Sequence, residues 1–171
     1  VEHANMLISL SQVSETLCIL LIPFVMSRFG IKRVMIIAML AWVFRFGLFG
    51  FGNPGSGVWM FVLSMIVYGV AFDFFNVSGS LFVNQEVSGK LRSSAQGLFV
   101  LMTNGVGATV GTLGAQAVIN NFVDMTSMAP QVEGWQTSWL IFAGYALAVA
   151  LLFMVVFDSG KKRQPTEKLT R

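Results

Sequence analysis

Five long apolar runs dominate the sequence, and each is long enough to cross a lipid bilayer as a helix. They lie at about residues 5–27, 33–52, 58–83, 93–120 and 135–157. A span needs about 20 apolar residues, and a backbone in lipid must satisfy its own hydrogen bonds, so helices are expected. Only 11% of the residues are charged, against about 25% in ordinary soluble domains. The sequence therefore predicts an all-α, polytopic membrane protein built as a bundle of five transmembrane helices.

The basic residues predict how this bundle is oriented in the bilayer. Ten of the eleven Lys and Arg fall in the connectors after the first and third runs or in the tail, residues 158–171. They are Arg28, Lys32, Arg33, Lys90, Arg92, Lys161, Lys162, Arg163, Lys168 and Arg171. The opposite side carries Glu2, Asp124 and Glu133 and no basic residue. Because cytoplasmic loops are enriched in Lys and Arg, we expect the chain to start outside and to end in the cytoplasm.

The eleventh basic residue, Arg45, lies inside the second run. At 1.5 Å per residue it is about 18 Å further in than Arg33. Two interpretations stay open: an arginine that snorkels to the outer headgroups, or an intramembrane ion pair with a carboxylate of a neighbouring helix. Asp73 is a possible partner, but its expected depth, about 22 Å from the outer end of its own helix, matches poorly.

The first run carries a pair of polar side chains near mid-bilayer. Gln12 and Glu15 are three residues apart and so share a helix face. A charged side chain at the bilayer centre costs about 2.5–3.5 kcal/mol on insertion scales and needs a partner, a proton or a water-filled cavity. Glu15 is therefore either a structural carboxylate bonded to a neighbouring helix or part of a substrate or proton site.

The third run combines aromatic residues with a carboxylate in the stretch YGVAFDFFNVSGS. Tyr68 and Phe72 are four apart and share a face, while Asp73 is turned about 100° away. Such an aromatic pair usually packs in a core, but this helix also supplies Asp73 and three further polar side chains. A phenol and a phenyl ring can stack on a planar ligand while the hydroxyl fixes its orientation.

No catalytic constellation accompanies these residues. The chain has one His and one Cys, and it shows no metal-ligand cluster, nucleophile elbow or phosphate-binding loop. We therefore expect neither an enzyme, nor a metal or cofactor, nor a nucleic-acid partner. The lipid bilayer is the partner that the composition implies.

Four segments resemble a known family. SRFGIKRVM is similar to the basic cytoplasmic loop of the major facilitator superfamily, although Ser27 stands where the acidic member of that motif is expected. YGVAFDFFNVSGSLFV and RSSAQGLFVLMTNGVG are more specific. Together with SQVSETL and WQTSWLIFAGY, they resemble bacterial nucleoside permeases, the nucleoside:proton symporters of that superfamily.

This resemblance implies a fold and a set of roles. Residues 1–171 would be most of the C-terminal half of a twelve-helix transporter, helices 8–12, with helices 1–7 missing upstream of Val1. The N-terminus of the chain would be periplasmic, in the bacterial inner membrane. The family's substrate-contacting positions match Gln12, Glu15, Tyr68 and Phe72. Asp73 matches a conserved aspartate of the family.

The implied function is proton-coupled nucleoside uptake by alternating access, with the proton as coupling ion and no cofactor. Asp73 and Glu15 are both candidates to carry the proton; we assign protons to Asp73 and substrate to Glu15. Two alternatives stay open. One is a symporter for sugars or other polar solutes, since Gln, Glu and aromatic side chains also recognise sugars. The other is a non-transporting membrane receptor or assembly subunit with structural acids.

Overall fold

The structure, a computed structural model, describes residues 4–53, 55–124 and 132–157, and its regular elements in these ranges are helical. In chain order they are α1 (Ala4–Phe51), α2 (Val58–Glu86), η1 (Gly89–Leu91), α3 (Arg92–Val100), η2 (Leu101–Gly107), α4 (Ala108–Phe122) and α5 (Val132–Val156). η1 is a 3₁₀ turn and η2 is π-helical. The predicted tail 158–171 and its five basic residues lie outside the described residues.

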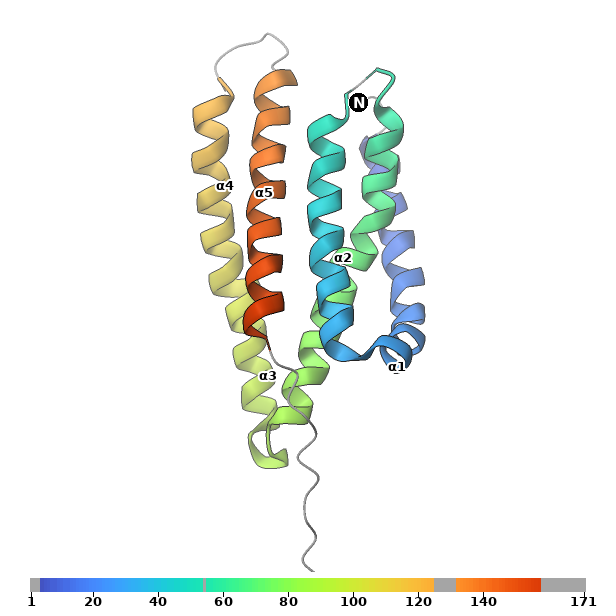
Figure 1. The fold of residues 1–171 in the computed structure, drawn as a ribbon, viewed down its shortest axis with the longest axis vertical. Helices are drawn as coiled ribbons and strands as arrows, with labels where there is room; N and C mark the ends of the chain where they lie inside the picture. The colour runs from blue at the N-terminus through green and yellow to red at the C-terminus, as the bar shows by residue number, and fades with distance from the viewer. Residues whose placement is uncertain (1–3, 54, 125–131, 158–171) are drawn as a thin grey trace, which may run out of the picture.

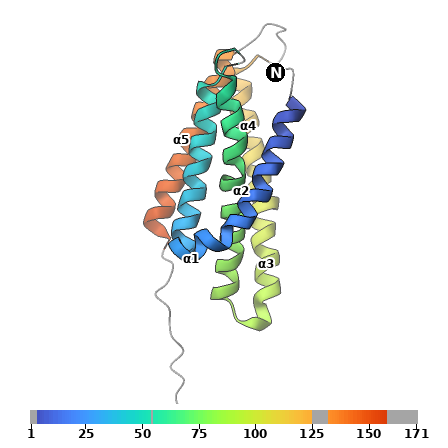
Figure 2. The ribbon, with the colours of Figure 1, turned by 90° about the vertical axis from the view of Figure 1, so that its right-hand side faces the viewer.

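α1 is divided by a sharp reversal at Gly30. This glycine has φ 75° and ψ 163°, a backbone region that is essentially restricted to glycine. Figures 1 and 2 show the chain running from the end marked N to a turn and then back toward that end, with α2 packed between the two arms. We call residues 4–29 the first arm and residues 31–51 the second arm. The predicted spans 5–27 and 33–52 fall on these two arms.

The later spans follow their predicted positions. α2 begins at Val58 as predicted and ends three residues beyond the expected end at 83. The run 93–120 is built by α3, η2 and α4 in succession, and the run 135–157 by α5. By length and composition, four helical segments can cross a membrane: Ile8–Phe51, Val58–Glu86, Gly89–Phe122 and Val132–Val156. The described residues therefore form a helical membrane bundle, in which both arms of α1 count as one segment.

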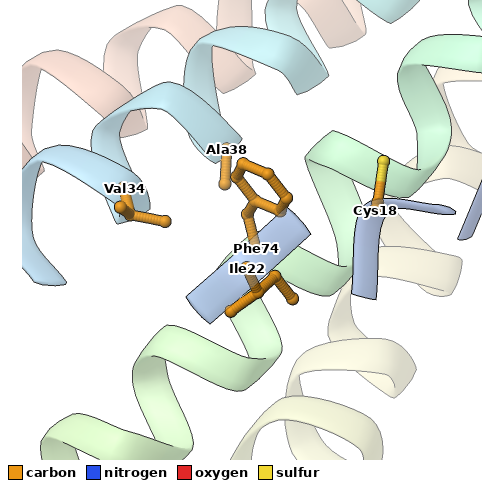
Figure 3. Packing of buried hydrophobic residues seen from close by; sticks show 5 residues of the cluster. All are labelled: Cys18, Ile22, Val34, Ala38 and Phe74. Atoms are coloured by element: carbon orange, nitrogen blue, oxygen red, sulfur yellow. The ribbon is translucent and has the colours of Figure 1, made fainter. Parts of the chain in front are cut away.

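The tightest packing joins the two arms of α1 to α2. Figure 3 shows the buried side chains of this core coming from all three: Cys18 and Ile22 from the first arm, Val34 and Ala38 from the second arm, and Phe74 from α2. Inside a bilayer the hydrophobic effect does not drive helices together, because lipid tails are as apolar as the side chains. Contacts of this kind hold the helices together by close packing.

Gly69 sets how closely the first arm approaches α2. A Cβ atom at this position would lie 2.8 Å from the backbone carbonyl of Ser14 and 2.9 Å from Sγ of Cys18. The hydroxyl of Ser14 donates to the carbonyl of Ile66 across the same contact. Because Glu15 follows Ser14 and Tyr68 precedes Gly69, this contact also fixes the relative height of two predicted site residues.

An aromatic cluster ties the second arm to α5 and α2. The ring centroids of Phe49 and Trp139 are 4.6 Å apart, and those of Phe46 and Trp139 are 5.9 Å apart. Phe49 also lies 5.6 Å from Phe61 of α2. Gln136 donates from Nε2 to the carbonyl of Gly52 at 3.2 Å. Aromatic contacts therefore join the second arm to α2 and α5 at the end of the bundle where α2 and α5 begin.

α3 is attached to α2 by a reciprocal pair of hydrogen bonds. The Ser80 hydroxyl donates to Oε1 of Gln96 at 3.0 Å, and Nε2 of Gln96 donates to the Ser80 carbonyl at 2.7 Å. The ring of Phe99 lies over Gly79, where a Cβ would be 2.6 Å from Cζ. No side chain of α3, η2 or α4 is buried within the described part of the chain.

Candidate functional site

The first arm presents its two predicted site residues beside its buried face. Ser11, Ser14, Cys18 and Ile22 form that buried face. Gln12 is exposed and Glu15 is half-buried, so both flank the contact with the rest of the bundle. Neither side chain makes a hydrogen bond or an ion pair to any other described residue. Both therefore have free donor or acceptor atoms inside an apolar segment.

α2 adds the predicted aromatic pair. The rings of Tyr68 and Phe72 are stacked, with centroids 5.5 Å apart and an angle of 19° between their planes. The expected shared face is thus confirmed. Phe72 has 37% of its surface exposed, whereas Tyr68 is half-buried. Within this pair, the ring of Phe72 is accessible at the surface of the described bundle, and the ring of Tyr68 is partly covered.

Arg45 lies against these rings. Its Cζ atom is 4.2 Å from the centroid of Tyr68, 5.4 Å from that of Trp42 and 5.7 Å from that of Phe49. Nε and Nη1 are buried and have no hydrogen-bond partner among the described residues. Arg45 is half-buried, and its guanidinium packs on the rings of the second arm and of α2.

Glu15 is the carboxylate of the first arm that lies at the level of Arg45 along the chain. Glu15 and Arg45 each lie fifteen residues from Gly30, one before it and one after it. On antiparallel arms that separation, about 22 Å of helix rise, places them at the same height. The charges of Glu15 and Arg45 are close enough to influence one another electrostatically. Arg45 forms a close ion pair with neither Asp73 nor Glu15 among the described residues.

Asp73 occupies a different place from the aromatic pair. It is 7% exposed, and its Oδ2 atom is buried without a hydrogen-bond partner in the described structure. It is close enough to Cys18 of the first arm to act on it electrostatically. Asp73 therefore lies in the contact between α2 and the first arm, behind the face that carries Tyr68 and Phe72.

Of the sequence-predicted residues, the structure stacks Tyr68 on Phe72 and places Glu15 next to the contact that Ser14 makes with α2. Gln12 lies about one turn along the first arm from Glu15, and Asp73 lies in the adjoining helix contact. Sequence reasoning missed the part that Arg45 plays here; the equal spacing from Gly30 was the available signal. No three His, Cys, Asp or Glu side chains gather as a metal site among the described residues.

The sequence model of the family described as "Nucleoside H+ symporter" matches residues 1–162. The nucleoside permease NupG of Escherichia coli (strain K12) is 50% identical over 167 residues, which are 97% of this chain and 39% of that protein. The xanthosine permease of the same strain is 51% identical over 158 residues, 92% of this chain and 37% of that protein.

The fold agrees with these relatives. The crystal structure of nucleoside transporter NupG superposes with a TM-score of 0.82 at 50% identity, covering 92% of this chain and 38% of that one. A crystal structure of a mutant of NupG gives a TM-score of 0.84 over the same shares. The chain thus spans about two fifths of the length of the relatives it matches. With the family matched over nearly all of its residues, the chain belongs to the nucleoside H+ symporter family.

Proposed function

We propose that this chain forms most of the C-terminal half of a proton-coupled nucleoside transporter of the bacterial inner membrane, which works by alternating access. The names of the relatives, nucleoside permease and xanthosine permease, support the substrate class. The family description supports the proton as coupling ion. The single structural observation that carries the proposal is the set of free polar atoms on Gln12 and Glu15, on either side of the contact that Ser14 makes with α2.

The proposed topology has five crossings. The apolar segment Ile8–Phe51 has 44 residues, which is about 66 Å of straight helix and twice the thickness of a hydrocarbon core of about 30 Å. The reversal at Gly30 supports two crossings by its two arms. Arg28, Lys32 and Lys90 belong to the turns at the end opposite the label N in Figure 1. Basic turns favour the cytoplasm, so we place the N-terminus of the chain in the periplasm.

In the proposed site, each of these side chains can bind a different part of an uncharged nucleoside. The amide of Gln12 offers both a donor and an acceptor, and the carboxylate of Glu15 accepts from hydroxyl or N–H groups. Phe72 offers an open ring face for the base, and Tyr68 offers its hydroxyl. Binding sites commonly combine apolar walls with a few such polar groups. The helices that complete the transporter would supply the facing wall.

Asp73 is the proposed proton carrier. A buried carboxylate oxygen without a hydrogen bond is costly when charged, and a proton removes that cost. Because Asp73 lies where α2 meets the first arm, its protonation would be sensitive to any movement between these helices. Rocking of the two halves about a midplane site would then couple proton release to substrate release.

The test uses the whole transporter that contains this segment, purified and reconstituted into liposomes. An inward proton gradient should drive accumulation of radiolabelled uridine. Asp73→Asn should abolish this accumulation while preserving gradient-independent exchange of uridine across the membrane. Glu15→Gln should impair both. If Asp73→Asn still concentrates uridine, the proton assignment is wrong.

Competition with other solutes tests the substrate class in the same liposomes. Nucleosides should displace labelled uridine, and monosaccharides at the same concentration should not. Displacement by sugars would favour the sugar symporter instead. A Glu15→Ala protein that fails to fold, rather than folding without uptake, would favour the non-transporting alternative.

A further inference from the structure

Arg45 is the one described basic residue in the middle of a helical arm; the others lie around the turn at Gly30 or between α2 and α3. A cation at this depth is costly unless neighbouring groups compensate it. Its Nε and Nη1 atoms find no hydrogen bond among the described residues. Among the described residues, the groups that can compensate it are the rings and charges around it.

The rings provide the first part of this compensation. Trp42 and Phe49 lie on the second arm with Arg45, and Tyr68 comes from α2 and is the nearest ring at 4.2 Å. A guanidinium over an aromatic face is attracted by the negative charge of that face. The edge of Trp42 also meets Tyr68, with centroids 6.0 Å apart at 86°.

Tyr68 is consequently held by three neighbours. Arg45 lies over its ring, Trp42 meets it edge to face, and Phe72 stacks with it at 5.5 Å. A ring held in this way is fixed in orientation and has little open face left for a ligand. Phe72, with 37% of its surface exposed, is the ring that remains available.

The charge of Glu15 provides the second part. Glu15 lies at the height of Arg45 on the adjacent arm, and it acts on Arg45 without forming a close ion pair in the described structure. With Arg45 and Glu15 ionised and Asp73 protonated, the charges of these three groups sum to zero, which suits an uncharged ligand. Without Arg45, Glu15 would leave one uncompensated negative charge in a poorly screened region, which attracts cations.

We propose that Arg45 is a positioning and specificity-determining residue of the nucleoside site: it fixes the ring of Tyr68 and balances the charge of Glu15, so that uncharged nucleosides are accepted and cationic ones rejected. This inference rests on the proposed function. It also assigns base stacking to Phe72 and leaves Tyr68 to act through its hydroxyl.

The first test measures selectivity by equilibrium binding to the whole transporter. Adenosine is the neutral ligand, and 1-methyladenosine, which is cationic at neutral pH, is the charged one. Arg45→Gln should weaken adenosine binding and move the ratio of the two Kd values toward the cation, each by about tenfold, or 1.4 kcal/mol. Arg45→Lys should keep the ratio and lose part of the adenosine affinity, because an ammonium lacks the planar face that stacks on a ring.

Lys90→Gln is the matched control, since it removes an exposed positive charge from the turn between α2 and α3. It should change neither the adenosine affinity nor the ratio. An unchanged ratio in Arg45→Gln, or an equal shift in Lys90→Gln, would overturn the role in specificity.

The second test needs no ligand. Melting temperatures of wild type, Arg45→Gln, Tyr68→Leu and the double variant form a cycle. If Arg45 acts through the ring, its replacement should lower the melting temperature clearly in the wild-type background and much less when Tyr68 is leucine. Equal losses in both backgrounds would overturn the positioning role. A wild-type protein that binds no nucleoside would refute the proposed function, and this cycle would still decide whether Arg45 and Tyr68 are coupled.

Discussion

Replacing Gly69 by alanine should push the first arm of α1 away from α2. The new Cβ would lie 2.8 Å from the Ser14 carbonyl group, where ordinary contacts begin at 3.4 Å. The two backbones must therefore separate by about 0.6 Å, because a carbonyl group in a helix cannot rotate away. Overpacking of this kind typically costs about 1–3 kcal/mol, while alanine gains back about 0.5–1 kcal/mol of helix propensity. We expect a net loss of about 1–2 kcal/mol.

The matched control is Gly144→Ala in α5, where a Cβ would meet nothing within 4 Å. Thermal unfolding of the purified transporter should show a lower melting temperature for Gly69→Ala and an equal or higher one for Gly144→Ala. Uridine affinity should fall in Gly69→Ala as well, because Glu15 and Tyr68 adjoin the displaced contact. A Gly69→Ala protein that melts with or above the Gly144→Ala control would refute this reasoning.

Three further predictions concern the turn, the α2–α3 contact and the open ring. Gly30→Ala should destabilise the protein by about 1–3 kcal/mol through backbone strain, whereas Gly89→Ala, at a turn glycine with an ordinary φ and open space, should be neutral in the same melting assay. Gln96→Leu should cost about 1–3 kcal/mol, since it removes both hydrogen bonds to Ser80; an unchanged melting temperature would show that this pair contributes nothing. Phe72→Ala should weaken adenosine binding about tenfold through lost stacking, and Trp59→Ala, which removes another exposed ring of α2, should not; equal affinities for both variants would exclude Phe72 from the site.

Much of the fold follows from the positions of the apolar runs. The spans of α2 and α5 could be read from composition and from the glycine-rich and polar connectors around them. The reversal at Gly30 falls in the predicted connector after the first run, where a glycine permits a backbone angle closed to other residues. The π-helical stretch Leu101–Gly107 has no comparable signal, because a change of hydrogen-bond register within a helix does not require particular residue types.

The site was predictable where it depends on spacing within one helix. Gln12 with Glu15 and Tyr68 with Phe72 are such pairs, and the stacking of the second pair is confirmed. The burial of Asp73 depends instead on which face of α2 meets the first arm. Gly69 lies four residues before Asp73, on the same face, and it marks that contact. The presence of a glycine in the sequence does not by itself predict such a contact, because glycines also occur where nothing lies close to them, as at Gly144.

In the proposed transporter, Gln12 and Glu15 face water and substrate inside the membrane rather than lipid. Gln12→Cys provides the most direct test, with native Cys18, which is buried, replaced by alanine. A charged, membrane-impermeant thiol reagent should label this cysteine, and uridine should protect it. Leu17→Cys is the control, since Leu17 is 58% exposed but turned about 140° away on the same arm, and it should stay unlabelled. A Gln12→Cys protein that resists the reagent as Leu17→Cys does, or that is labelled equally with and without uridine, would contradict the account.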